Sequence, residues 1–78
     1  MWITNYCDSF AFNFDKVTGI RLEAGKKMFM NVVFFGPLLP DGSLRMGLYT
    51  EKQAREIFRD LMESHSNNRV YRLPVPAK

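Results

Sequence analysis

The sequence predicts an α+β domain: an antiparallel, meander-like sheet of four or five strands, one helix packed on one face, and a short C-terminal strand. Two observations lead to this prediction. The first 50 residues form short runs rich in aromatic and β-branched side chains, separated by turn residues, which is typical of strands. Residues 51–64 instead repeat apolar side chains at helical spacing. Because a helix must bury its apolar stripe, we expect this one to cover the sheet.

The helix is the element that local sequence specifies best. Thr50 is its predicted N-cap, and Gln53, three residues later, can complete a capping box. Tyr49, just before the cap, is expected to pack on Ala54 as a hydrophobic staple. The helix is predicted to run from Glu51 to about Ser64. Its apolar stripe consists of Ala54, Ile57, Phe58, Leu61 and Met62.

Turn residues divide the rest of the chain into strands. Residues 27–35 are apolar on both faces and are therefore expected to be a central strand. Gly19 is interpreted as a bulge, and residues 40–42 as a turn in which Gly42 takes the left-handed conformation. The predicted strands are residues 1–6, 17–23, 27–35 and 43–49, a short extended segment at 10–14, and a last edge strand at 69–73. In the strand at 43–49, the residues expected to point inward are Leu44, Met46 and Leu48.

Length and composition restrict the class of protein. A chain of 78 residues predicts one domain, residues 1–78, and its eleven aromatic side chains are natural core fillers. The single cysteine, Cys7, excludes an internal disulfide framework and a cysteine zinc site, and we expect it to be half-buried. No apolar run approaches the roughly 20 residues that a membrane span needs. The N-terminus lacks a secretory leader, so a cytosolic location is expected.

Residues suited to catalysis or metal binding do not cluster in the sequence. The only histidine, His65, lies in a polar stretch, and nothing places it beside Cys7 as a nucleophile–base pair would require. Asp8, Asp15 and Asp41 are isolated in predicted turns, where aspartate serves local backbone hydrogen bonds. We therefore predict a protein that is not an enzyme and has no cofactor, metal site or catalytic residues.

Protein contact is the first functional hypothesis. The central strand has two apolar faces, and the connection after it carries an exposed or folded-back pair of leucines. A second copy of the chain would also help so small a core, which favours a homodimer or another protein partner. The candidate contact residues are Phe29, Val33, Phe35, Leu38 and Leu39.

The alternative hypothesis is nucleic-acid binding by a basic, aromatic sheet face. The net charge is +3, and arginines interleaved with aromatic side chains on a sheet can neutralise phosphates and stack bases. The helix carries mixed charges, so it is a poor reader of a major groove. The candidate residues for single-strand or RNA contact are Arg21, Arg45, Arg69, Tyr71 and Arg72.

Three segments carry a resemblance to a known group of sequences: Asn-Phe-Asp-Lys-Val-Thr-Gly-Ile at 13–20, Asp-Gly at 41–42, and Leu-Tyr-Thr-Glu-Lys-Gln-Ala-Arg-Glu-Ile-Phe at 48–58. With Val-Tyr-Arg-Leu-Pro at 70–74, they resemble short uncharacterised proteins of Gram-positive bacteria and their phages or mobile elements. The connection at 36–40 is longer than the hairpins usual in that group. The group has no catalytic residues to transfer and no assigned activity. A small phage or mobile-element accessory protein, such as an inhibitor of a host machine, would fit the protein-contact hypothesis.

Overall fold

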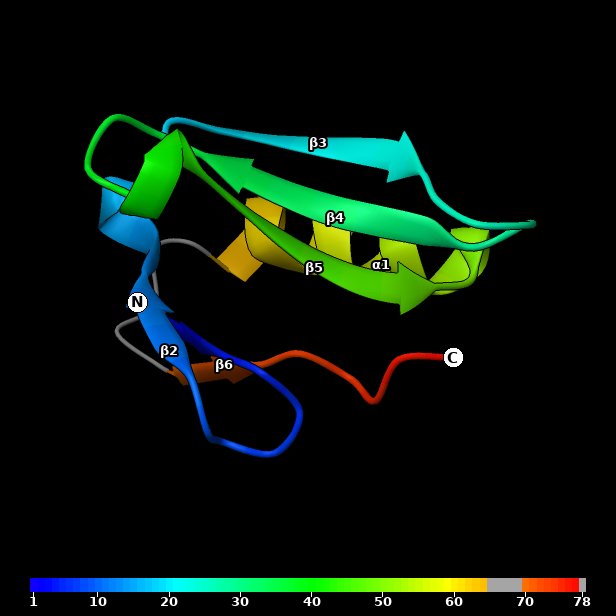
Figure 1. Ribbon diagram of the computed structural model, residues 1–78. Coiled ribbons are helices and arrows are strands. Elements are labelled where there is room, and N and C mark those ends of the chain that lie inside the picture. Colours follow the sequence, from blue (N-terminus) through cyan, green and yellow to red (C-terminus); the bar gives the residue numbers. More distant parts are fainter. Residues whose placement is uncertain (65–69, 78) are drawn as a thin grey trace.

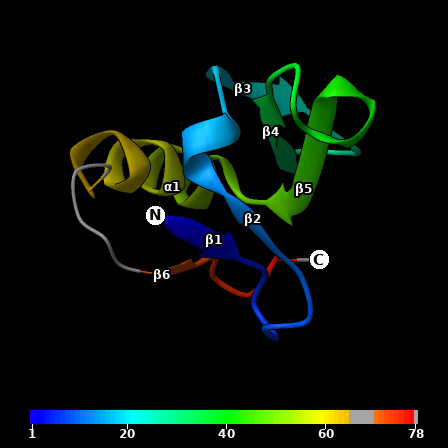
Figure 2. The same cartoon turned by 90° about the vertical axis from the view of Figure 1, so that its left-hand side faces the viewer.

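The computed structural model describes residues 1–64 and 70–77 and confirms the α+β class (Figure 1). The described strands form two sheets of three, with strand orders β2-β1-β6 in sheet A and β3-β4-β5 in sheet B. One helix, α1, lies against sheet B, and sheet A packs beside both, so that the three units surround a common core (Figure 2).

Sheet B is the antiparallel meander that the sequence predicts. It consists of β3 (Gly19–Ala24), β4 (Met30–Phe35) and β5 (Ser43–Tyr49), with β4 in the centre. Side chains alternate along β4, so Val32 and Phe34 face the helix and are fully buried. The expectation of a central strand is confirmed, but the strand begins at Met30 and not at residue 27 as predicted.

Sheet A is built from both ends of the chain. It consists of β1 (Trp2–Thr4), β2 (Ala11–Asn13) and β6 (Val70–Arg72). β1 pairs with β2 as an antiparallel hairpin and with β6 in parallel. The short 3₁₀ helix η1 (Phe14–Lys16) lies between β2 and β3, where the chain passes from sheet A to sheet B.

The predicted capping box opens helix α1 (Glu51–Ser64). The Gln53 backbone N–H donates to Thr50 Oγ1 at 3.1 Å, and the Thr50 N–H donates to Gln53 Oε1 at 3.1 Å. The expected apolar stripe divides in two. Ala54, Ile57 and Leu61 are buried, whereas two other members of the stripe stay partly exposed: Phe58 and Met62.

The β-bulge of sheet B lies in β5, between Met46 and Tyr49, and not at Gly19 as expected. Gly19 begins the regular β3–β4 ladder, so its prediction as a bulge is wrong. In β5 the register changes by one residue between the pairs Val32↔Met46 and Met30↔Tyr49. Because of this extra residue, Tyr49 enters the core, and Leu48, which was expected to point inward, is half-buried outside it.

Two connections have conformations that bear on the predictions. In the 3₁₀ turn η2 (Pro40–Gly42), Gly42 has φ 79° as predicted, and Asp41 is also left-handed at φ 55°. In the β1–β2 connection, Cys7 is exposed, so the expectation of a half-buried side chain is wrong. Its thiol lies 3.1 Å from the Ser9 hydroxyl within a tight turn.

No helix among residues 1–64 and 70–77 is long and apolar enough to cross a membrane.

Candidate interaction surfaces

The outer face of sheet B carries an ion-pair network. Arg21, Val33 and Arg45 lie directly opposite one another across the three strands. Glu23 accepts from both arginines: its Oε1 lies 2.9 Å from Arg45 Nη2 and its Oε2 lies 2.8 Å from Arg21 Nε. The two guanidinium groups therefore share one carboxylate on this face.

This network covers part of the apolar face that was predicted for contact. Val33 is only 2% exposed although it lies on the outer side of the sheet. Phe35 is half-buried; its ring occupies the space above Gly19 and lies 5.5 Å from the Arg21 guanidinium, within cation–π range. On this face, the arginines thus pair with Glu23, and the Arg21 guanidinium also contacts the Phe35 ring.

The ion pairs predict a measurable titration shift for Glu23. The hydrogen bond from Arg45, and then the one from Arg21, hold the pKa of Glu23 below its ordinary value of 4.5. A lowered folded-state pKa stabilises the fold above pH 4.5, and this contribution is lost as the pH falls through the lowered pKa. We expect Arg45→Gln to raise the Glu23 pKa toward 4.5 in a carbon-13 NMR titration of the carboxyl group.

Arg55→Gln is the matched control for that titration. Arg55 pairs with Glu51 on the helix, at 2.9 Å, and does not touch Glu23. The control is expected to leave the Glu23 titration unchanged. If both variants moved the Glu23 pKa equally, long-range charge and not the direct hydrogen bonds would be the cause.

The outer face of sheet A is a second, different surface, which we call the Trp2 face. Cross-strand neighbours form two rows on it: Val70, Trp2 and Asn13 in one, and Arg72, Thr4 and Ala11 in the other. Ile3, between the rows, points inward and is fully buried. Trp2 is 51% exposed in the middle strand, and Val70 beside it is 64% exposed.

Arg72 on the Trp2 face forms an ion pair with Asp8. Its Nη2 donates to Asp8 Oδ2 at 2.7 Å and its Nε donates to Asp8 Oδ1 at 3.1 Å, a bidentate pair. The Thr4 hydroxyl also donates to Asp8 Oδ1, at 3.2 Å. The positive charge of Arg72 is therefore neutralised at the edge of this face.

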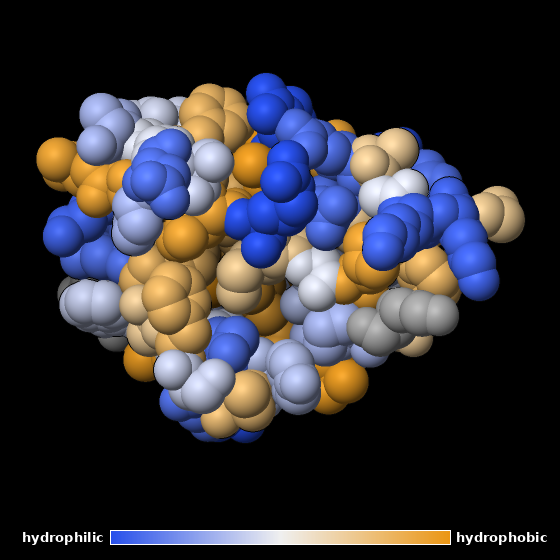
Figure 3. All heavy atoms as spheres, in the orientation of Figure 1, coloured by the Kyte–Doolittle hydropathy of each residue, from blue (hydrophilic) through white to orange (hydrophobic). Residues whose placement is uncertain are grey.

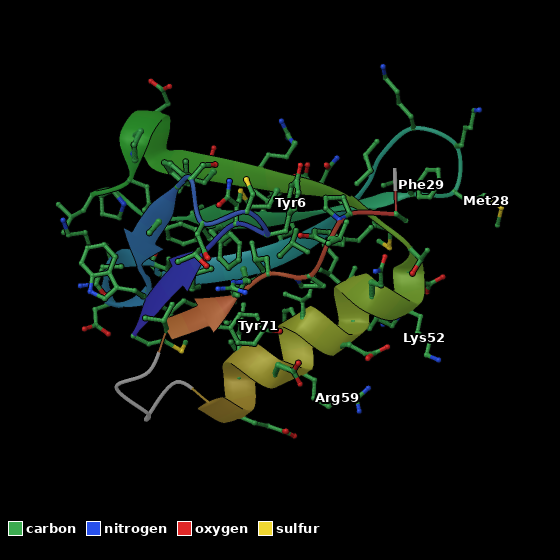
Figure 4. All side chains as sticks on the ribbon, turned by 90° about the horizontal axis from the view of Figure 1, so that it is seen from below. Tyr6, Met28, Phe29, Lys52, Arg59 and Tyr71 are labelled. Carbon is green, nitrogen blue, oxygen red and sulfur yellow. The ribbon has the colours of Figure 1, made fainter. Side chains whose placement is uncertain are left out.

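The residues predicted for nucleic-acid contact do not form one surface. Arg21 and Arg45 lie on sheet B, whereas Tyr71 and Arg72 lie on sheet A. Tyr71 is half-buried and points toward α1, where its hydroxyl donates to Asp60 Oδ2 at 3.1 Å (Figure 4). Burial, and then this carboxylate, raise the pKa of Tyr71. Arg69 lies outside the described residues.

The residues predicted for protein contact are also dispersed. Leu38 protrudes from the β4–β5 connection and is 71% exposed, while Leu39 folds back into the core. Phe29 is half-buried in the β3–β4 connection, next to the exposed Met28, at the far end of the molecule from Tyr71 (Figure 4). Figure 3 shows that apolar side chains also gather beside β2 on the face it presents.

A shallow groove of about 400 Å³ lies between α1 and β3. It is lined by Leu22 from the strand and by Arg55, Phe58 and Arg59 from the helix. Sequence reasoning assigned Phe58 to the helix stripe and did not identify this groove. The reason is that the stripe is wider than the strip of sheet that α1 covers.

The described residues contain no group of three or more His, Cys, Asp or Glu side chains that could hold a metal ion. His65 lies outside the described residues, so its distance from Cys7 is not defined. Comparison with protein-family models, with curated proteins and with solved structures finds no match.

Proposed function

We propose that this chain is a non-enzymatic protein-binding module that contacts its partner through the Trp2 face. The observation that supports this is the Val70–Trp2 row, in which a largely exposed tryptophan occupies the centre of a three-stranded sheet. Tryptophan is among the residues that contribute most binding free energy in protein interfaces. With this function we propose the role of a small phage or mobile-element accessory protein in the cytosol.

The charges favour a protein partner over nucleic acid. Arg21 and Arg45 share Glu23, and Arg72 is paired bidentately with Asp8. Binding to nucleic acid gains much of its affinity from free cations that displace counterions from phosphates. Guanidinium groups that already have carboxylate partners supply little of this gain, whereas a neutralised arginine beside an apolar row suits a protein surface.

The test uses Trp2 as a reporter, because it is the only tryptophan in the chain. A photo-crosslinking amino acid placed at Val70 should capture one protein in the organism that makes the chain. The purified partner should then shift Trp2 emission to shorter wavelength in a saturable titration. Because a tryptophan that dominates an interface is worth about 2 kcal/mol or more, Trp2→Lys is expected to weaken binding by at least about 30-fold.

Val75→Lys is the matched control, since Val75 is an exposed apolar residue outside the two sheets. It should bind the partner like the unmodified chain. A partner that binds Trp2→Lys with unchanged affinity would contradict the proposed surface. Binding of a labelled single-stranded oligonucleotide that weakens steeply with added salt would instead favour the nucleic-acid alternative.

A further inference from the structure

β3 is the longest regular edge that the described part of the chain leaves unpaired. It forms one side of sheet B, six residues long, and lies at the top of Figure 1. At the other side of the sheet, β5 carries the bulge, and its Leu48 carbonyl accepts from the Ala77 N–H at 2.9 Å. The edges of sheet A, β2 and β6, are three residues each. An exposed strand edge is a template for another strand.

The register identifies the free backbone groups of β3. The Gly25 N–H donates to the Phe29 carbonyl at 2.8 Å, which continues the β3–β4 ladder by one pair. Hydrogen-bonded and non-hydrogen-bonded pairs alternate in an antiparallel ladder. The odd-numbered residues of β3 therefore bond to β4. The residues whose N–H and C=O groups point away from the sheet are Ile20, Leu22 and Ala24.

We propose that this edge pairs with β3 of a second copy of the chain, antiparallel and about a two-fold axis at Leu22. Leu22 then lies opposite Leu22 of the partner subunit, and Arg21 lies opposite Glu23 of the partner subunit. All three outward-facing residues find hydrogen-bonding partners in this arrangement, and the two copies share a six-stranded sheet. The proposal goes beyond the protein-binding function because it uses another surface and names its occupant.

Charge selects this register. Moving the axis by one residue would place Arg21 opposite Arg21, or Glu23 opposite Glu23, and like charges directly opposite one another are destabilising. With the axis at Leu22, Arg21, which pairs with Glu23 of its own chain, also faces Glu23 of the partner subunit. This is a non-hydrogen-bonded pair, where side chains approach most closely, so the contact extends the ion-pair network and introduces no like-charge repulsion. Charges of one sign protect an edge strand from pairing with a second copy. Opposite charges two residues apart do not, because an antiparallel second copy places each charge opposite one of the other sign.

The inner side of the same edge carries apolar side chains. Leu22 of β3 and Phe58 of α1 line the groove between the two elements, together with Arg55 and Arg59. A second copy paired at this edge brings its own Leu22 and Phe58 to the same place, so that apolar surface from both subunits is removed from water. This one contact thus pairs the outward-facing backbone groups, places opposite charges together and buries Leu22 and Phe58.

The test is a charge exchange measured by sedimentation equilibrium on the full chain. The unmodified chain is expected to sediment at twice its mass of 9.1 kDa, that is 18.2 kDa. Arg21→Glu places glutamate opposite glutamate, and Glu23→Arg places arginine opposite arginine, so each variant alone should sediment at 9.1 kDa. An equimolar mixture of the two variants should return to 18.2 kDa, because both cross-strand pairs become attractive.

Two further readings complete this test. Far-UV circular dichroism checks that each variant is folded, and hydrogen exchange should show the Leu22 amide protected in the dimer but not in either variant alone. The proposal is overturned by an unmodified chain that stays monomeric up to about 1 mM, the weak end of measurable affinity. It is also overturned by a dimer that both variants leave intact, or by a mixture that stays monomeric. None of these outcomes affects the Trp2 test, which uses other residues.

Discussion

Replacing Phe34 with alanine is expected to lower the free energy of unfolding by about 3–5 kcal/mol. Phe34 is fully buried in β4, and its ring packs edge-on against Phe12, with centroids 4.9 Å apart. Phe12 belongs to sheet A, so this aromatic pair connects the two sheets. The truncation therefore creates a cavity and also removes a contact between the sheets. At about 0.05–0.15 kcal/mol per residue, 78 residues provide only about 4–12 kcal/mol in total.

The Phe34 prediction is measured by urea unfolding followed by far-UV circular dichroism. Phe10→Ala is the matched control, because Phe10 also lies beside Phe12 but is 42% exposed. Its expected cost is about 1 kcal/mol, since much of its ring is already in water. Equal losses in the two variants would contradict the position of Phe34 at the centre of the core.

Leu73→Ala is expected to cost about 2–5 kcal/mol, although Leu73 lies only five residues before Lys78. The side chain is 1% exposed within the core, and the Leu73 N–H donates to the Thr4 carbonyl at 2.9 Å. Loss of the side chain should loosen the attachment of β6 to β1. The amides of β1 should therefore exchange faster in this variant through local opening. The amides of β4, in contrast, should exchange only through global unfolding.

Urea unfolding and hydrogen exchange measure the Leu73 effect together. Val75→Ala is the control, because Val75 lies two residues further along and is exposed. We expect it to change the free energy of unfolding by no more than about 0.5 kcal/mol. A Leu73 variant as stable as this control would show that the segment after β6 contributes nothing to the core.

The parts of the fold that local sequence determines were predicted. Thr50 and Gln53 are three residues apart, so their capping box is visible in the sequence, and the apolar run of β4 identifies a central strand. The pairing of β1 with β6 was not predicted, because it joins distant segments whose local patterns contain no information about each other. The bulge was assigned to Gly19 for the same reason: its true position depends on how β5 aligns with β4.

The candidate surfaces were predictable by residue type and not by arrangement. Arg21, Arg45 and Arg72 were selected as cations, but their carboxylate partners are set by tertiary structure; Asp8 lies 64 residues from Arg72. Period-two alternation places Trp2 opposite Ile3, yet alternation alone does not say which face of a strand is buried. The structure resolves this in favour of Ile3, which leaves Trp2 exposed.

The parallel pairing of β1 with β6 also has a consequence for synthesis of the chain. The strand pairs of sheet B lie entirely within residues 19–49, and α1 follows directly at residue 51, so these elements can form early. β1 and β2 together make only a short hairpin, which is marginal in water by itself. At about 5–20 residues per second, the ribosome needs about 3–12 s to advance from Phe12 to Leu73. During that interval Ile3 and Phe12 lack the cover of β6, and this is when the nascent chain is most exposed to chaperones and aggregation.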